Sequence, residues 1–220
     1  MPESTHSKRD MIRVVMLGRL GNNLFQYAFG RALAEKHKVR LVLDASWFNS
    51  RTWPYVEPLR RLPGIVDGKA EVVRPFSFGS RVLKKLSGKH HWEFSRGTPV
   101  REREGDHSFD AGLLESPADS VVMGYFQTPL YFGGLEKSLR SELATNDLNL
   151  EIGHEDLAAQ LRHPSAVAVH VRRADYVRHP HLISLDRKYY ERAMDRMRQE
   201  IQNPQFLVFS DDPQWCVEAF

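Results

Sequence analysis

The sequence predicts an α/β protein made of two Rossmann-like halves, each with a parallel sheet. Two observations support this. A strand, glycine turn, helix and second strand follow one another over 12–44, and a strand, loop, helix and strand recur over 166–209. Parallel strands joined by a helical crossover are the unit of such folds. We expect a flexible leader over 1–10, a first half over 11–155 and the start of a second half over 156–220.

Composition predicts a packed, soluble chain. It has 220 residues, 41% of them hydrophobic, and a net charge of +3, which argues against a nucleic-acid-binding protein. The single Cys216 cannot form an intramolecular disulfide. Because the amino terminus is polar and no apolar run approaches the roughly 18 residues of a membrane span, we expect a cytoplasmic protein.

Glycines and asparagines separate the first strand from the first helix. Gly18 and Gly21 permit a tight turn and close backbone approach by a ligand, and Asn22 or Asn23 is expected to cap the helix. Free amides at a helix amino terminus favour anions. The spacing is not G-x-G-x-x-G, so ordinary turn chemistry is an equal alternative. The expected first-half elements are strands over 12–17, 39–44 and 121–123, and helices ending at 38 and spanning 135–143.

Prolines and glycines break the pattern over 47–105 and leave room only for short elements. A strand then ends in aromatic and amide side chains in the sequence Gly124-Tyr-Phe-Gln127. Aromatic faces and amides suit a sugar, although packing against the following helix explains the aromatics equally well.

The clearest sign of function lies at the end of the strand predicted over 166–171. His170, Arg172, Arg173 and Asp175 follow its apolar run. Two arginines at the carboxyl end of a parallel strand place positive charge where open α/β sheets bind ligands, and a guanidinium matches phosphate oxygens. The alternative is a solvated strand end with a salt bridge to Asp175.

Two acidic residues follow the strand predicted over 206–209. Pro213 suits the first turn of a helix that Ser210, Asp211 or Asp212 could cap, so capping and ligand binding are both open for this pair. Helices are also expected over 155–161 and 187–201.

Four motifs in this order resemble the bacterial alpha-1,2-fucosyltransferase family, glycosyltransferase family 11. They are Gly18-Arg-Leu-Gly-Asn-Asn-Leu-Phe-Gln-Tyr27, Gly124-Tyr-Phe-Gln127, His170-Val-Arg-Arg-Ala-Asp175 and Phe209-Ser-Asp-Asp212. The resemblance implies a GT-B-like architecture, with an acceptor-side first half facing a GDP-sugar-binding second half across a cleft. A Ser-Ser-Phe-Ser-Trp-Trp-like motif usual in the family is absent, so we expect the second half to be incomplete. Asn23 stands where Gln is usual.

The implied activity is inverting transfer of L-fucose from GDP-fucose to a galactoside hydroxyl of an oligosaccharide acceptor, with an alpha-1,2 linkage and without a metal or other cofactor. Alpha-1,6 transfer and a non-catalytic GDP-sugar- or glycan-binding remnant are the alternatives. Peripheral membrane contact through a lipid-linked acceptor and homo-oligomerisation stay open.

The resemblance also implies residue roles. By this resemblance Arg172 contacts the β-phosphate with support from Arg173. No Asp-x-Asp motif is present to hold a cation, so another group must neutralise the charge of the departing GDP, and arginine can do so. Asp175 is the first candidate for the general base, with orientation of an arginine as the alternative. The expected donor contacts are His170 and Asp211 or Asp212 on guanine, together with Gly21, Asn22 and Asn23 from the other lip of the cleft.

Overall fold

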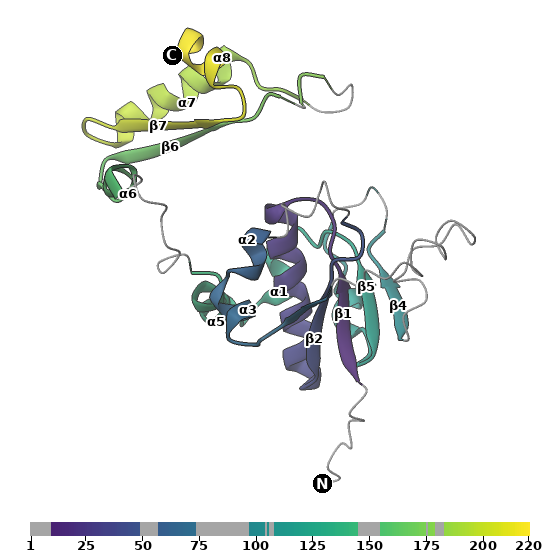
Figure 1. Ribbon diagram of the computed structural model, residues 1–220. Coiled ribbons are helices and arrows are strands. Elements are labelled where there is room, and N and C mark those ends of the chain that lie inside the picture. Colours follow the sequence, from purple (N-terminus) through teal and green to yellow (C-terminus); the bar gives the residue numbers. More distant parts are fainter. Residues whose placement is uncertain are drawn as a thin grey trace. The chain divides into compact units, whose positions relative to one another are not determined.

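The computed structural model describes residues 10–48, 57–73, 97–103, 105, 108–144, 155–174, 176–178 and 183–220. The chain divides into two compact units, Met1–Leu148 and Asn149–Phe220 (Figure 1). Each unit contains parallel strands and helices, which confirms the predicted α/β class. No helix in the described part of the chain has the length and apolar character needed to cross a bilayer.

A parallel sheet of five described strands forms the centre of the first unit, in the order β3-β2-β1-β5-β4. β1 pairs with β2 on one side and with β5 on the other, so the strands that follow β1 in the chain extend the sheet first in one direction and then in the other. The strand order therefore reverses between β1 and β5. Open α/β sheets bind ligands at the carboxyl ends of strands beside such a switch point. The strands are β1 (Met11–Val15), β2 (Arg40–Asp44), β3 (Glu71–Val73), β4 (Thr98–Arg101) and β5 (Ser120–Met123).

The core of this unit lies where α1 (Leu20–His37) packs against the sheet. Phe29 of α1 is fully buried, with its ring centroid 4.2 Å from that of Phe126 and 5.1 Å from that of Tyr131. The remaining described helices of the unit are α2 (Glu57–Arg60), α3 (Pro63–Val66), α5 (Glu136–Glu142) and the 3-10 turns η3 (Ala111–Glu115) and η4 (Pro129–Phe132).

The predicted cap of the first helix is wrong. Helix α1 begins at Leu20, and its N-cap is Arg19, which makes no side-chain cap hydrogen bond. Gly18 adopts φ +75° and turns the chain into the helix before either asparagine. Asn22 and Asn23 therefore lie inside the first turn, where Asn23 Nδ2 donates back to the Leu17 carbonyl at 2.9 Å.

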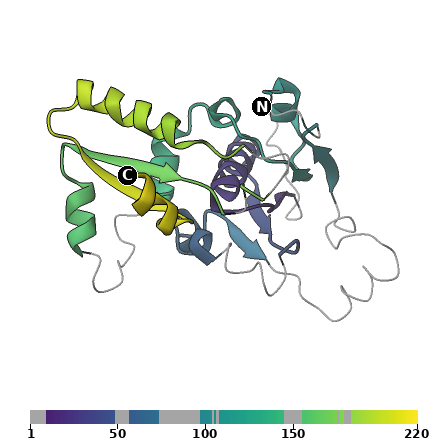
Figure 2. The ribbon, with the colours of Figure 1, turned by 90° about the horizontal axis from the view of Figure 1, so that it is seen from above.

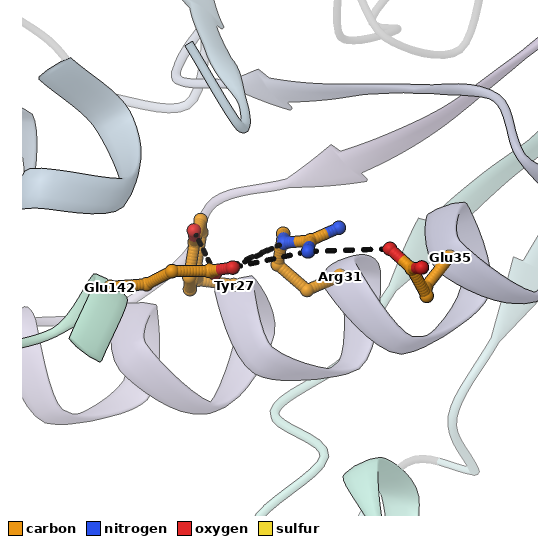
Figure 3. Close-up of polar contacts among 4 residues, drawn as sticks. All are labelled: Tyr27, Arg31, Glu35 and Glu142. Atoms are coloured by element: carbon orange, nitrogen blue, oxygen red, sulfur yellow. Dashed lines mark hydrogen bonds and ion pairs between the residues drawn. The ribbon is translucent and has the colours of Figure 1, made fainter. Parts of the chain in front are cut away.

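A buried polar cluster joins α5 to α1 (Figure 3). The Glu142 carboxylate accepts a hydrogen bond from the Tyr27 hydroxyl at 2.6 Å and from Arg31 Nε at 3.0 Å. Arg31 and Glu142 are each 8% exposed, whereas Glu35, which contacts Arg31 Nη2 at 3.5 Å, has a 62% exposed side chain. Sequence analysis did not find this cluster.

The second unit contains a two-stranded parallel sheet, and Figure 2 shows α7 running alongside it. Its core contains Val171, Tyr190 and Cys216, with Trp215 packed against them. The predictions for 155–161 and 166–171 are confirmed at both ends. The elements are α6 (Glu155–Leu161), β6 (Ala166–Val171), α7 (Arg187–Glu200), β7 (Gln205–Ser210) and α8 (Pro213–Ala219).

Candidate active site

Strand pairing in the second unit brings the arginines and the acidic pair together. In the β6–β7 register His170 faces Phe209 and Val171 faces Ser210, so the next two residues of each strand leave the sheet side by side. Arg172 Nε contacts Asp211 Oδ2 at 3.0 Å, and Arg173 Nε contacts Asp212 Oδ2 at 3.2 Å. The motifs over 170–175 and 209–212, separate in sequence, therefore form one site.

Asp211 also holds the backbone of the arginine loop. Its Oδ1 accepts the amide of Arg173 at 2.8 Å and that of Ala174 at 3.2 Å. The Arg173 amide, together with the Ala174 amide and the nearby Arg172, outweighs the effect of burial and holds the pKa of Asp211 below its usual value. The carboxylate is therefore ionised at neutral pH and keeps the loop in a defined conformation.

Asp212 has two roles in the same structure. Its Oδ1 accepts the Trp215 amide at 3.3 Å, so Asp212 is the N-cap of α8, while its Oδ2 contacts Arg173. Of the two roles left open by the sequence, capping is confirmed for Asp212. The arginine contact is an additional role that the sequence did not reveal.

Two aromatic residues missed by sequence analysis complete the support of the arginines. The Arg173 guanidinium lies 4.1 Å from the ring centroid of Trp215, a cation–π distance. Burial raises the pKa of Tyr190, whose hydroxyl is hydrogen-bonded to the backbone of Arg172. The only signal in the sequence was the position of Trp215 in the first turn of the predicted last helix.

His170 is exposed at the end of β6, beside the arginines. Arg172 and Arg173 are partly accessible, with side chains 28% and 19% exposed. The predicted general base, Asp175, lies outside the described residues, so its role stays a prediction.

Side-chain amides join two loops at the switch point of the first unit. Gln26 accepts the Leu17 amide at 3.1 Å and donates to the Gly124 carbonyl at 2.8 Å. Gln127 Nε2 donates to Asn22 Oδ1 at 2.8 Å. The predicted motifs over 18–27 and 124–127 are thus neighbours at the carboxyl ends of β1 and β5.

The three predicted contact residues of the first loop have different environments. Gly21 is exposed and Asn22 is half-buried, so both are accessible. Asn23 is fully buried, and its Nδ2 also donates to Gln26 Oε1 at 3.2 Å. In this conformation Asn23 supports the loop from within the fold.

Comparison with known proteins agrees with this arrangement. The model of Glycosyl transferase family 11 matches residues 113–220, which include Gly124–Gln127, the arginine loop and the acidic pair. Over these residues the chain is similar to glycosyl transferase family 11. Among the described residues of this glycosyltransferase, no group of three or more His, Cys, Asp or Glu side chains could hold a metal ion.

Individual relatives extend the match to most of the chain. The chain is 27% identical over 209 residues to an alpha-1,2-colitosyltransferase of Escherichia coli, covering 91% of this chain and 69% of that protein. It is 26% identical over 246 residues to the O-antigen biosynthesis glycosyltransferase WbnK of Escherichia coli, with coverage of 92% and 73%. It is 33% identical over 230 residues to the galactoside alpha-(1,2)-fucosyltransferase 1 of Mus musculus, covering 99% of this chain and 53% of that protein.

Proposed function

We propose that this glycosyltransferase moves L-fucose from GDP-fucose to a galactoside hydroxyl of a glycan, forms an alpha-1,2 linkage and inverts the anomeric centre. The observation that carries the proposal is the pair Arg172 and Arg173, held at the carboxyl ends of two parallel strands by Asp211 and Asp212. The names of the relatives support the linkage. A GT-B-like architecture is part of the proposal.

The arginines would act on the leaving group. The acceptor oxygen attacks the anomeric carbon of fucose, the bond from that carbon to the phosphate oxygen breaks, and negative charge grows on the departing GDP. Arg172 would stabilise that charge on the β-phosphate, with Arg173 in support, without having to reorganise. The acceptor proton would pass to a base, for which Asp175 is the candidate.

The contacts of Asp211 and Asp212 indicate that both carboxylates position the arginine loop. Asp211 accepts two backbone amides and contacts Arg172 Nε, whereas Asp212 accepts one backbone amide and a hydrogen bond from Arg173 Nε. A carboxylate has about four acceptor positions, so guanine contact by one of these residues stays part of the proposal. His170, exposed on the same strand end, is the second proposed guanine contact.

The test is calorimetric binding of GDP, GDP-fucose, ADP and UDP to the 220-residue chain, followed by transfer of fucose to lactose. We expect guanine-selective binding and release of GDP with product of alpha-1,2 linkage. Equal binding of the three nucleoside diphosphates would overturn the donor assignment. Binding without transfer to any galactoside would favour the non-catalytic alternative, and an alpha-1,6 product would overturn the linkage.

Colitosyl transfer is a second candidate, because an alpha-1,2-colitosyltransferase aligns with 91% of the chain. Colitose lacks a hydroxyl that fucose carries, so the two donors test whether the site binds that group. A higher kcat/KM with GDP-colitose than with GDP-fucose, measured with the same acceptor, would replace fucose as the proposed donor sugar.

Replacing Asp211 by asparagine is expected to weaken GDP binding by about tenfold, because an amide loses the charge that holds Arg172. The melting temperature should change little, since partly exposed ion pairs contribute little to stability. The pKa of Asp211 is lower in the folded chain than its usual value of 3.8. Its carboxylate contacts are therefore fully present above pH 3.8 and are lost as the pH falls through the lower pKa of the folded state. Asp195→Asn, in an exposed ion pair with Arg198 on α7, is the control.

Excess EDTA is expected to leave transfer unchanged, because arginines would neutralise the leaving group. The measurement is the initial rate of GDP release with and without chelator. Inactivation by EDTA that added Mg²⁺ or Mn²⁺ reverses would contradict the metal-independent mechanism.

A further inference from the structure

A cavity of about 270 Å³ lies within the first unit, beyond the carboxyl end of β4. Its walls include Glu102 and Arg103, which follow β4 directly, and Phe109, Asp110 and Tyr131. Nothing in the sequence pattern pointed to it. Its volume is near the lower end of small-molecule sites, which begin at about 300 Å³, and suits a ligand of one sugar ring.

Phe109 supplies an accessible aromatic side chain. It is 37% exposed, and its ring centroid lies 5.0 Å from that of Tyr131, which is 1% exposed. The Asp110 amide donates to the Tyr131 hydroxyl at 2.9 Å, so the backbone beside Phe109 is fixed to the buried core. A partly exposed ring on a rigid support favours stacking on the apolar face of a pyranose.

The polar groups of the cavity favour a neutral ligand. The lining includes two carboxylates, on Glu102 and Asp110, and one guanidinium, on Arg103, so it has a net negative charge that disfavours phosphate or a sugar acid. Asp110 Oδ1 accepts the Gly112 amide at 2.8 Å, which orients its carboxylate. Planar carboxylate and guanidinium groups can each bond two neighbouring hydroxyls.

Glu102 connects the cavity to the switch point. Its carboxylate accepts the Tyr125 amide at 2.6 Å and the Phe126 amide at 3.1 Å. Phe126 has φ +52°, a conformation that a non-glycine residue adopts only when its surroundings hold it there. A Cβ on Gly124 would lie 2.5 Å from Glu102 Cβ, so only glycine allows this close approach. One wall of the cavity is therefore fixed to the segment that carries Gln127.

We propose that this cavity is a subsite for one neutral hexose ring of the acceptor glycan. The ring would stack on Phe109, with its hydroxyls bonded by Asp110 and Arg103. The assignment to the acceptor rests on the proposed function, whereas binding of a hexose does not require that transfer occurs.

The experiment measures binding of methyl β-D-galactopyranoside to the 220-residue chain by saturation-transfer NMR, with GDP affinity measured on the same samples by calorimetry. Phe109→Leu keeps an apolar side chain but removes the ring, and should weaken galactoside binding about tenfold while leaving GDP affinity unchanged. Asp110→Asn keeps the ability to cap η3 and should also weaken galactoside binding. Leu130→Ala, which removes a 59% exposed side chain in η4 outside the cavity lining, is the matched control.

The outcomes separate this inference from the proposed function. Absence of galactoside binding by the wild-type chain, or wild-type binding by both Phe109→Leu and Asp110→Asn, would overturn the subsite whatever the donor results are. Galactoside binding that depends on Phe109, in a chain that binds no guanine nucleotide and transfers no sugar, would support the subsite and overturn the proposed donor chemistry.

Discussion

Replacing Arg172 by alanine is expected to lower kcat for fucosyl transfer by about 10² or more, as removal of a preorganised charge-stabilising donor does. The effect should fall on turnover, because the charge on the leaving phosphate is larger in the transition state than in the bound donor. The chain should remain folded, since the Arg172 side chain is 28% exposed and its partner Asp211 keeps two backbone amides. Single-turnover rates at saturating GDP-fucose measure the effect.

Arg172→Lys should recover only part of this loss. A lysine ammonium keeps the charge but cannot contact both Asp211 and a phosphate with the planar geometry of a guanidinium. Arg196→Ala removes an arginine of the same unit whose side chain is 68% exposed and paired with Glu200, and it should behave as wild type. A rate for Arg172→Ala within roughly threefold of the wild type would contradict the assigned role.

Replacing Glu142 by alanine is expected to lower the free energy of unfolding by about 3–5 kcal/mol, because it leaves the buried Arg31 guanidinium without its buried counter-charge. Glu142 accepts hydrogen bonds from both Arg31 and Tyr27, so the tyrosine hydroxyl also loses its acceptor (Figure 3). Urea unfolding of the first unit, followed by circular dichroism, measures the difference.

Glu35→Ala provides the matched control on the same arginine. Glu35 lies one turn from Arg31, its side chain is 62% exposed, and its loss should cost only about 0.5 kcal/mol or less. Equal destabilisation by Glu142→Ala and Glu35→Ala would show that burial of the Arg31–Glu142 pair does not determine how much free energy of unfolding is lost.

The pH dependence of this cluster has a defined sign. Burial alone would raise the pKa of Glu142, but hydrogen bonds from Arg31 and Tyr27 outweigh it and hold the pKa below the usual value of 4.5. A carboxylate with a lowered folded pKa stabilises the protein above its unfolded pKa and loses that contribution as the pH falls through the folded value. The stability difference between wild type and Glu142→Gln should therefore narrow below about pH 4.5.

Local patterns predicted the second unit well. The apolar run of β6, the Asp-Pro start of α8 and the long polar helix α7 each carry a signal within one segment of sequence. The arginines were identified because charge at a strand end is a local feature too. The contacts of Asp211 and Asp212 with those arginines depend on strand register, which the sequence does not display.

The first unit shows what local patterns miss. The short strands β3 and β4 lie within the stretch of glycines and prolines that gave no periodic signal. The cavity residues Phe109 and Asp110 follow that stretch, and only the fold brings them beside Tyr131. Glu142 lies on a short polar helix, where a charged residue usually faces water, and only its partner on α1 shows that it is buried.

The register of β6 and β7 limits how this protein can vary in evolution. Arg172 and Arg173 meet Asp211 and Asp212 only because Val171 faces Ser210 across the sheet. Inserting or deleting one residue in either strand would send alternate side chains to the opposite face and separate both charge pairs at once. Heritable length changes are therefore expected to accumulate between the strands but outside α7, whose Tyr190 packs beside Val171, while the spacing within each strand and its charged end is inherited unchanged.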